Sequence, residues 1–264
     1  MPIALSIAGS DPTGGAGLQL DLQVFRALGV HGAGVLTALT VQDTRRVHRV
    51  LPVFPSVVQD QLRVLLGDIT PHAIKIGMLA TDDVLRAVER SLDALPAASP
   101  PPQVLDPVLA ASGGGPPLLE RRAWDGLRRL CARVALVTPN LPEAEALTGC
   151  DVSSRKGVEK AARRFVDELG AGAALVKGGH AREGAHDCLA LREGEGVAIH
   201  WLEGERLAGP AAHGTGCALA AAVAAGLARG LGMREAVTEA RRFVTRALAA
   251  AFAAGRGAPL LGLP

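Results

Sequence analysis

Residues 3–28 read IALSIAGSDPTGGAGLQLDLQVFRAL, and three patterns follow one another in this stretch. The apolar run Ile3–Ala8 ends at a glycine, as a buried strand does. Residues 9–17 are rich in Gly, Asp, Pro and Thr, a composition typical of a tight loop. The segment that continues to about Leu28 has helical character. The stretch therefore predicts a strand, a glycine-rich loop and a helix, which is the first half of a βαβ unit.

The same alternation continues along the chain. Short β-rich runs predict further strands at Val35–Leu39, Val50–Val53, Ala73–Ile76, Val104–Leu105, Val134–Val137 and Ala173–Val176. Apolar residues at helical spacing and alanine-rich stretches predict helices around Val58–Leu66, Val84–Leu95, Val158–Leu169, Thr215–Arg229 and Arg234–Ala254. Strands separated by helices of this kind indicate an α/β fold with a largely parallel sheet. The proline-rich residues 96–102 lie between a predicted helix and strand, so we interpret them as a stiff loop and expect one domain over residues 1–264.

Composition excludes several classes of partner. The 264 residues are 48% hydrophobic, and 28 basic against 26 acidic residues give a net charge of +2. We therefore expect no binding to nucleic acid or to an anionic membrane, and with no tyrosine and 3% aromatic residues the chain lacks rings for stacking on bases. The N-terminal apolar run is too short for a signal peptide, and residues 217–227 fall short of the ~18 residues of a membrane span. Four cysteines without a C-x-x-C pair favour a reduced protein of the cytoplasm.

The strongest local signal is HGTGC at residues 213–217, which opens directly into an alanine-rich helix. Glycines at a helix start let backbone N–H groups converge on an anion, and the helix dipole favours negative charge there. At this terminus we expect Cys217 to have a lowered pKa and some thiolate character, so that it could act as a base or a nucleophile. The alternative is a glycine-rich turn with a small core thiol.

Several polar or soft side chains stand just past predicted strands. They are Gln42, Met78, Asp106, Asn140, Glu143 and Lys177. Any one could be an ordinary turn residue, and Asn140 is a natural helix cap. Because the carboxyl ends of parallel strands share one edge of the sheet, the set favours a ligand site at that edge. Carboxylates such as Asp106 and Glu143 suit Mg²⁺ that is bound through water and substrate phosphates.

Other motifs are incomplete. Gly9 and Gly14 have P-loop spacing, but Gly15-Ala16 follow where Lys and Ser or Thr are required. Nor do the loop glycines continue into a dinucleotide-binding fingerprint. His180, His186 and Cys188 are a weak zinc alternative, since we expect them in a solvated turn region.

An ordered set of motifs resembles the hydroxymethylpyrimidine/phosphomethylpyrimidine kinases of thiamine biosynthesis. The matching segments are IAGSDPTGGAGLQLDL at 7–22, TALTVQDT at 37–44, KIGML at 75–79, LDPV at 105–108, TPNLPEAE at 138–145, VKGGH at 176–180 and HGTGC at 213–217. The resemblance implies a ribokinase-like α/β fold, with a mostly parallel sheet and helices on both faces. It also implies two Mg²⁺-assisted phosphoryl transfers from ATP to 4-amino-5-hydroxymethyl-2-methylpyrimidine, and a homodimer.

The resemblance also assigns roles to individual residues. The pyrimidine would be surrounded by Gly9, Asp21, Gln42, Met78 and Val108. Gly214, Thr215 and Gly216 would stabilise the transferring phosphoryl group, and Cys217 would accept the substrate's hydroxyl proton. Asp106, Asn140 and Glu143 would organise Mg²⁺ and the triphosphate, with the metal held by Asp106 and Glu143 through water. Lys177, Gly178 and Gly179 would border the nucleotide.

The chain departs from the family pattern at a few positions, and two alternatives stay open. Alanines at 111, 211, 212 and 218 stand where relatives usually carry larger or polar side chains that would contact phosphate or nucleotide. A pyridoxal-type kinase is one alternative, because its substrate is also a flat ring with a hydroxymethyl group. The other is a paralogue that binds the pyrimidine but transfers no phosphate.

Overall fold

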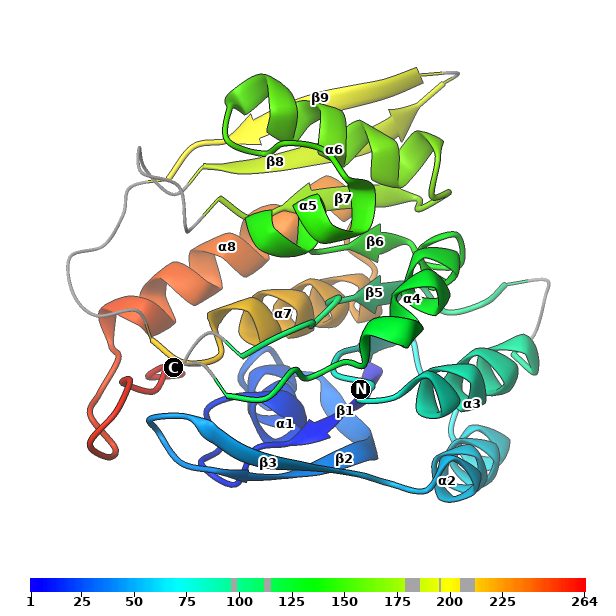
Figure 1. The fold of residues 1–264 in the computed structure, drawn as a ribbon, viewed down its shortest axis with the longest axis vertical. Helices are drawn as coiled ribbons and strands as arrows, with labels where there is room; N and C mark the ends of the chain where they lie inside the picture. The colour runs from blue at the N-terminus through cyan, green and yellow to red at the C-terminus, as the bar shows by residue number, and fades with distance from the viewer. Residues whose placement is uncertain (96–98, 112–114, 179–185, 195, 205–211) are drawn as a thin grey trace.

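The computed structural model describes residues 1–95, 99–111, 115–178, 186–194, 196–204 and 212–264, and its centre is one sheet of nine strands (Figure 1). The strands are β1 (Ile3–Ser10), β2 (His31–Gln42), β3 (Val47–Pro52), β4 (Ala73–Ile76), β5 (Gln103–Leu105), β6 (Leu136–Val137), β7 (Ala173–Val176), β8 (Asp187–Glu193) and β9 (Gly196–Leu202). Their order is β3-β2-β1-β4-β5-β6-β7-β8-β9. The six central strands, β2, β1, β4, β5, β6 and β7, run parallel to one another. At the edges, β3 pairs antiparallel with β2, β8 with β7 and β9 with β8.

Helices cover both faces of the sheet, as the ribokinase-like α/β prediction requires. One face packs against α1 (Gly17–Ala27), α7 (Thr215–Ala228) and α8 (Met233–Ala249). The other packs against α2 (Pro55–Asp68), α3 (Asp82–Asp93), the 3₁₀ turn Arg121–Ala123, α4 (Trp124–Cys131), α5 (Leu141–Thr148) and α6 (Arg155–Asp167). Neighbouring strand residues alternate between the two faces of the sheet. Leu5 and Ile74 pack on the face covered by α2 to α6, while Ala4 and Ala73 pack on the face covered by α1, α7 and α8. The predicted fold class is confirmed.

The topology fixes where a ligand can bind. From β1 the chain crosses to β2 on one side, and then to β4 on the other side of β1. In open parallel sheets the crevice at such a reversal, outside the carboxyl ends of the strands, is the usual binding site. The carboxyl ends of β1, β2 and β4 therefore mark the expected pocket, and those of β5 to β7 extend the same edge.

Two predicted strands, Ala73–Ile76 and Ala173–Val176, match β4 and β7 residue for residue. Helices α4 and α5 and the β8–β9 hairpin were not predicted from the sequence. The prediction for Cys188 was wrong, because this residue is fully buried in β8 rather than in a solvated turn. His180 lies outside the described residues. Among those described, no helix is long and apolar enough to cross a membrane.

Candidate active site

The N-terminus of α7 is the geometric centre of the site. Its N-cap residue Gly214 has φ +79°, and a Cβ there would lie 1.8 Å from the Gly15 carbonyl oxygen. Only glycine suits a left-handed conformation in such close contact. The contact joins the glycine-rich loop between β1 and α1, the first loop of the chain, to the start of α7. The first-turn N–H groups of Thr215, Gly216 and Cys217 have no partner four residues back in a helix, and the first turn contains no acidic residue. This terminus can therefore receive an anion.

Cys217 differs from the prediction. Its side chain keeps some exposed surface, yet burial among protein atoms raises the pKa of its thiol to about 12, although Lys75 nearby acts in the opposite direction. The expectation of a lowered pKa and thiolate character is therefore wrong for the free protein. The helix terminus is only one influence on the thiol, and Asp106 and Asp21 also oppose a thiolate. Cys217 is a neutral thiol at neutral pH.

Asp106 and Lys177 form an ion pair beside that thiol. Lys177 Nζ donates to Asp106 Oδ1 at 2.8 Å, and the Cys217 thiol lies close enough to Asp106 to help lower the pKa of its carboxyl. Burial alone would raise the pKa of the Asp106 carboxyl, but Lys177 and then Lys75 hold it below its usual range. A Cβ on Gly216 would lie 3.0 Å from Lys177 Nζ, so a side chain there would crowd the pair. The ends of β5 and β7 and the N-terminus of α7 thus meet at the predicted phosphate side.

Asn140 and Glu143 join this group through a capping box at the start of α5. Glu143 N–H donates to Asn140 Oδ1 at 2.9 Å, and Asn140 N–H donates to Glu143 Oε2 at 2.8 Å. Glu143 is 5% exposed, and this burial raises its carboxyl pKa to about 7 in spite of Lys177. Both residues lie after β6 at the predicted phosphate side, and the hydrogen bonds between them stabilise the start of α5.

A second, fully buried ion pair lies on the α1 side of the sheet. Lys75 Nζ of β4 donates to Asp21 Oδ2 of α1 at 2.7 Å, and the Ser6 hydroxyl donates to the same oxygen at 2.5 Å. The other carboxylate oxygen, Asp21 Oδ1, is buried and has no hydrogen-bond partner among the described residues. Burial raises the pKa of Asp21, while Lys75 acts against that change. The predicted substrate residue Asp21 thus fixes a lysine that in turn faces Cys217.

Three predicted substrate residues gather at the topological crevice. A Cβ on Gly9, at the end of β1, would lie 2.9 Å from Met78 Sδ. Val108 packs against the small apolar cluster that contains Met78, Ala38 and Ala80. The Met78 carbonyl accepts the Thr37 hydroxyl at 2.5 Å, which holds the segment after β4 against β2. Gly9, Met78 and Val108 together provide a narrow, mostly apolar wall.

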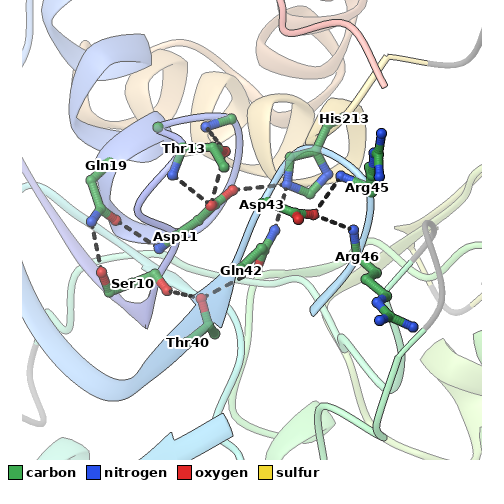
Figure 2. Close-up of polar contacts among 12 residues, drawn as sticks. Ser10, Asp11, Thr13, Gln19, Thr40, Gln42, Asp43, Arg45, Arg46 and His213 are labelled. Atoms are coloured by element: carbon green, nitrogen blue, oxygen red, sulfur yellow. Dashed lines mark hydrogen bonds and ion pairs between the residues drawn. The ribbon is translucent and has the colours of Figure 1, made fainter. Parts of the chain in front are cut away.

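Gln42 approaches from the end of β2, and it contacts a residue that the sequence analysis did not assign (Figure 2). Its side-chain Nε2 lies 2.9 Å from Nε2 of His213, which also lies 2.8 Å from Asp11 Oδ2. Asp11 belongs to the first loop, and His213 directly precedes the helix N-cap. Polar contacts therefore connect three segments of the candidate site.

Two further predicted residues differ in their placement. Gly178 N–H donates to Asp187 Oδ1 at 2.8 Å, and a Cβ on Gly178 would lie 1.9 Å from the His186 carbonyl oxygen. Its immediate role is the connection from β7 to β8. Gly179 lies outside the described residues, as does Ala211.

Lys75, His213 and Asp11 are members of the site that were not predicted from the sequence. A lysine in the middle of a four-residue apolar strand was a usable signal, because an ammonium group is rarely buried without a partner. His213 and Asp11 gave no comparable signal, since their contact joins residues 202 positions apart.

The fold and the arrangement at α7 define the class as a ribokinase-like phosphotransferase. A family model described as phosphomethylpyrimidine kinase matches residues 11–261. The chain is 38% identical over 258 residues to the hydroxymethylpyrimidine/phosphomethylpyrimidine kinase of Staphylococcus aureus, covering 97% of this chain and 91% of the relative. The chain belongs to the phosphomethylpyrimidine kinase family, so the resemblance and the predicted enzyme class are confirmed.

Solved structures include both kinase types that the sequence analysis weighed. A phosphomethylpyrimidine kinase from Clostridium difficile has a TM-score of 0.81 at 31% identity, covering 94% of this chain and 100% of the relative. An ADP complex of Bacillus subtilis pyridoxal kinase has a TM-score of 0.87 at 32% identity, covering 99% and 96%.

Proposed function

We propose that this chain transfers a phosphoryl group from ATP to the hydroxymethyl group of 4-amino-5-hydroxymethyl-2-methylpyrimidine, and a second one to the resulting monophosphate, in thiamine biosynthesis. The observation that carries the proposal is the N-terminus of α7, where a glycine cap, a thiol and the Asp106–Lys177 pair meet at the edge of the sheet. Family membership gives the pyrimidine as substrate.

In the proposed reaction, the substrate's hydroxymethyl oxygen forms a bond to the γ-phosphorus while the bond to the leaving ADP oxygen breaks. The N–H groups at Gly214, Thr215 and Gly216 stabilise the charge on the transferring group. Cys217 is a neutral thiol, so it can take up the hydroxyl proton only by giving up its own. The neighbouring Asp106 carboxylate is the acceptor that we propose for the thiol proton. The proton thus moves from substrate to sulfur while the thiol proton moves to the carboxylate.

Asp106 and Glu143 fit a magnesium ion that is held mainly by phosphates and water. Each carboxylate already accepts a hydrogen bond from the protein, and the described residues contain no group of three or more Asp, Glu, His or Cys that could hold a metal ion by themselves. Mg²⁺ in kinases is commonly bound by one or two carboxylates together with substrate phosphates. When bound, the ion would neutralise charge on the triphosphate, and Asn140, Lys177, Gly178 and Gly179 would border the nucleotide.

On the substrate side, Gly9, Met78 and Val108 would enclose the ring, with Gln42 and Asp21 supplying polar contacts. The amide of Gln42 offers one donor and one acceptor, which is the pattern that an aminopyrimidine edge requires. Of the alanine departures, Ala212 and Ala218 are buried and Ala111 packs on the cluster around Met78. These three positions therefore serve packing, and we assign the phosphate contacts to backbone instead.

A pyridoxal-type kinase is the second candidate, and the likeness to the Bacillus subtilis enzyme favours it. Incubation with MgATP and either hydroxymethylpyrimidine or pyridoxal, followed by mass analysis, separates the two. We expect mono- and diphosphate from the pyrimidine. Pyridoxal phosphate alone would move the chain to the other activity, and no product from either would leave a binding protein without transfer.

We further propose that residues 1–264 form a single kinase domain, supported by the one sheet to which all nine strands belong.

A homodimer is proposed from family resemblance. It is supported by four exposed apolar residues on and beside the β2–β3 edge, Leu39, Val41, Leu51 and Phe54. Sedimentation of the purified chain tests the dimer. Four free thiols support a reducing compartment such as the cytoplasm.

A further inference from the structure

Asp11, His213 and Gln42 form a polar chain that ends at the proposed ring pocket; we refer to it as the Asp11–His213–Gln42 network. One histidine nitrogen, Nε2, contacts both neighbours, at 2.8 Å from Asp11 Oδ2 and 2.9 Å from the Gln42 amide (Figure 2). The Asp11 side chain is 4% exposed and the His213 side chain 16%. Such a buried arrangement has few ways to place its protons, because each contact requires one donor and one acceptor.

The Asp11 end of the network is fixed as an acceptor. Asp11 Oδ1 accepts both the N–H and the hydroxyl of Thr13 at 2.9 Å, which leaves Oδ2 for His213. Burial acts to raise the pKa of Asp11, but the hydrogen bonds from His213 and Thr13 outweigh it and keep the pKa below its usual value. An ionised carboxylate can only accept, so the proton between the two residues sits on His213 Nε2.

The far end of Gln42 gives an independent constraint. The Thr40 hydroxyl has one proton, and it lies 2.8 Å from the Ser10 carbonyl oxygen, which can only accept. Toward Gln42, whose amide lies 3.2 Å away, the hydroxyl is then an acceptor. The end of the amide that faces Thr40 must therefore be the NH₂ group. A half-turn of the amide exchanges its nitrogen and oxygen without changing its shape, so these neighbours decide which is which.

Both constraints select the same arrangement, in which the nitrogen and oxygen of the Gln42 amide are exchanged relative to Figure 2, where Nε2 faces His213 and Oε1 faces Thr40. The Gln42 carbonyl faces His213 and shares the single Nε2–H with Asp11 Oδ2 in a bifurcated hydrogen bond, while the Gln42 NH₂ donates to Thr40. The reverse orientation would put two donors together at His213 and two acceptors at Thr40. We propose that Asp11 and His213 are positioning residues that fix the orientation of the Gln42 amide, and thereby set the donor–acceptor pattern with which this pocket recognises an aminopyrimidine.

The inference rests on the proposed function for the contact between Gln42 and the ring. One N–H and one carbonyl lone pair of Gln42 remain for a ligand, and an amino group beside a ring nitrogen offers the complementary pair. The hydroxymethyl group must point toward the N-terminus of α7 to react, so the ring cannot turn over to match an inverted amide. The orientation of Gln42 therefore determines substrate specificity.

Asp11→Asn tests this directly. The new amide keeps an oxygen for the two Thr13 donors, so its NH₂ faces His213. His213 Nε2 must then accept, and its proton moves to Nδ1. The Gln42 amide inverts, and the Thr40 hydroxyl turns from the Ser10 carbonyl to donate to the Gln42 oxygen. We expect the pyrimidine KM to rise roughly 10- to 100-fold, with a smaller change in kcat. Pyridoxal, which lacks an amino group beside a ring nitrogen, should be affected less.

A second readout needs no substrate. The ¹⁵N shifts of His213 in the free protein should report a proton on Nε2 in the wild type and on Nδ1 in Asp11→Asn. Asp43→Asn is a matched control, because Asp43 Oδ1 accepts two N–H groups and Oδ2 lies 3.1 Å from His48 Nε2, on the exposed β2–β3 turn. It should leave both the His213 shifts and the pyrimidine KM unchanged within about twofold.

Three outcomes would overturn the proposal: a wild-type His213 protonated only on Nδ1, an Asp11→Asn variant that keeps the wild-type tautomer, or an inverted tautomer with an unchanged pyrimidine KM. Failure of the proposed function looks different, because the wild type itself would then not phosphorylate the pyrimidine. If Asp11→Asn does not fold, Thr40→Val removes the acceptor for the Gln42 NH₂ and suits strand β2. An unchanged pyrimidine KM in that variant would equally overturn the proposal.

Discussion

The buried carboxyl of Glu143 makes the stability of this protein depend on pH in a way that one substitution can remove. Burial raises the pKa of Glu143 from its ordinary 4.5 to about 7. The folded protein therefore prefers the protonated group. The stabilisation of the folded state by the protonated Glu143 carboxyl is complete below pH 4.5, and it is lost as the pH rises through about 7. From the size of the shift, the loss is about 3 kcal/mol.

Glu143→Gln should abolish this dependence while keeping the capping box. Glutamine retains a carbonyl oxygen for the Asn140 N–H, so the start of α5 is conserved. We expect the variant to resemble the wild type at pH 5 and to exceed its stability at pH 8 by up to about 3 kcal/mol. Urea denaturation at both values measures this, with a relative midpoint change of up to about 1 M.

Glu145→Gln provides the control, since Glu145 is exposed on the same helix. Its stability relative to the wild type should not change between pH 5 and pH 8, because burial cannot act on an exposed carboxylate. Parallel pH profiles for the wild type and Glu143→Gln would refute the argument that burial dominates at this site. So would a Glu143→Gln variant that is already strongly destabilised at pH 5.

Three further substitutions test separate parts of the site. Gly214→Ala puts a Cβ 1.8 Å from the Gly15 carbonyl at φ +79°, so we expect a lower melting temperature, a cost of more than about 1–2 kcal/mol and reduced kcat. Cys217→Ala should lower kcat by roughly 10²- to 10⁴-fold and change the pyrimidine Kd little; wild-type kcat would remove its role as proton acceptor. Lys75→Met leaves the buried Asp21 carboxylate without its ammonium partner and should cost about 3–5 kcal/mol in urea denaturation. Adding Asp21→Leu should recover most of that loss, and no recovery would argue against an uncompensated charge as the cause.

The sequence predicted those features that depend on local pattern. Buried parallel strands such as Ala173–Val176 are continuous apolar runs, and the loop after β1 has the composition of a tight turn, so both could be located in advance. The β8–β9 hairpin could not, because its strands lack clear alternation of apolar and polar residues, although Gly194, with φ +58°, stands at the first position of a two-residue turn. Helix α5 was hidden by its length of eight residues, although Asn140 and Glu143 carried a capping box three positions apart.

The site also contains features that the sequence predicted and features that only the fold determines. Family motifs located Asp106, Lys177 and Cys217 near one another, and their contacts agree with that expectation. The protonation state of Cys217 was predicted wrongly, because the helix N-terminus is visible in sequence whereas the surrounding protein atoms and the two nearby carboxylates are not. Likewise, the contact of His213 with Asp11 and Gln42 depends on loops whose approach is set only by the fold.

The charges around Cys217 explain how a thiol with so high a pKa can still serve a kinase. Both lysines near it are already paired, Lys75 with Asp21 and Lys177 with Asp106. A triphosphate that arrives in the proposed reaction adds negative charge beside Lys177 and competes with Asp106 for its ammonium group. Any weakening of that ion pair raises the proton affinity of Asp106, since Lys177 is what chiefly lowers its pKa. In the proposed reaction, Asp106 therefore becomes a better acceptor for the thiol proton when the phosphoryl donor is present, and Cys217 can remain a neutral thiol at other times.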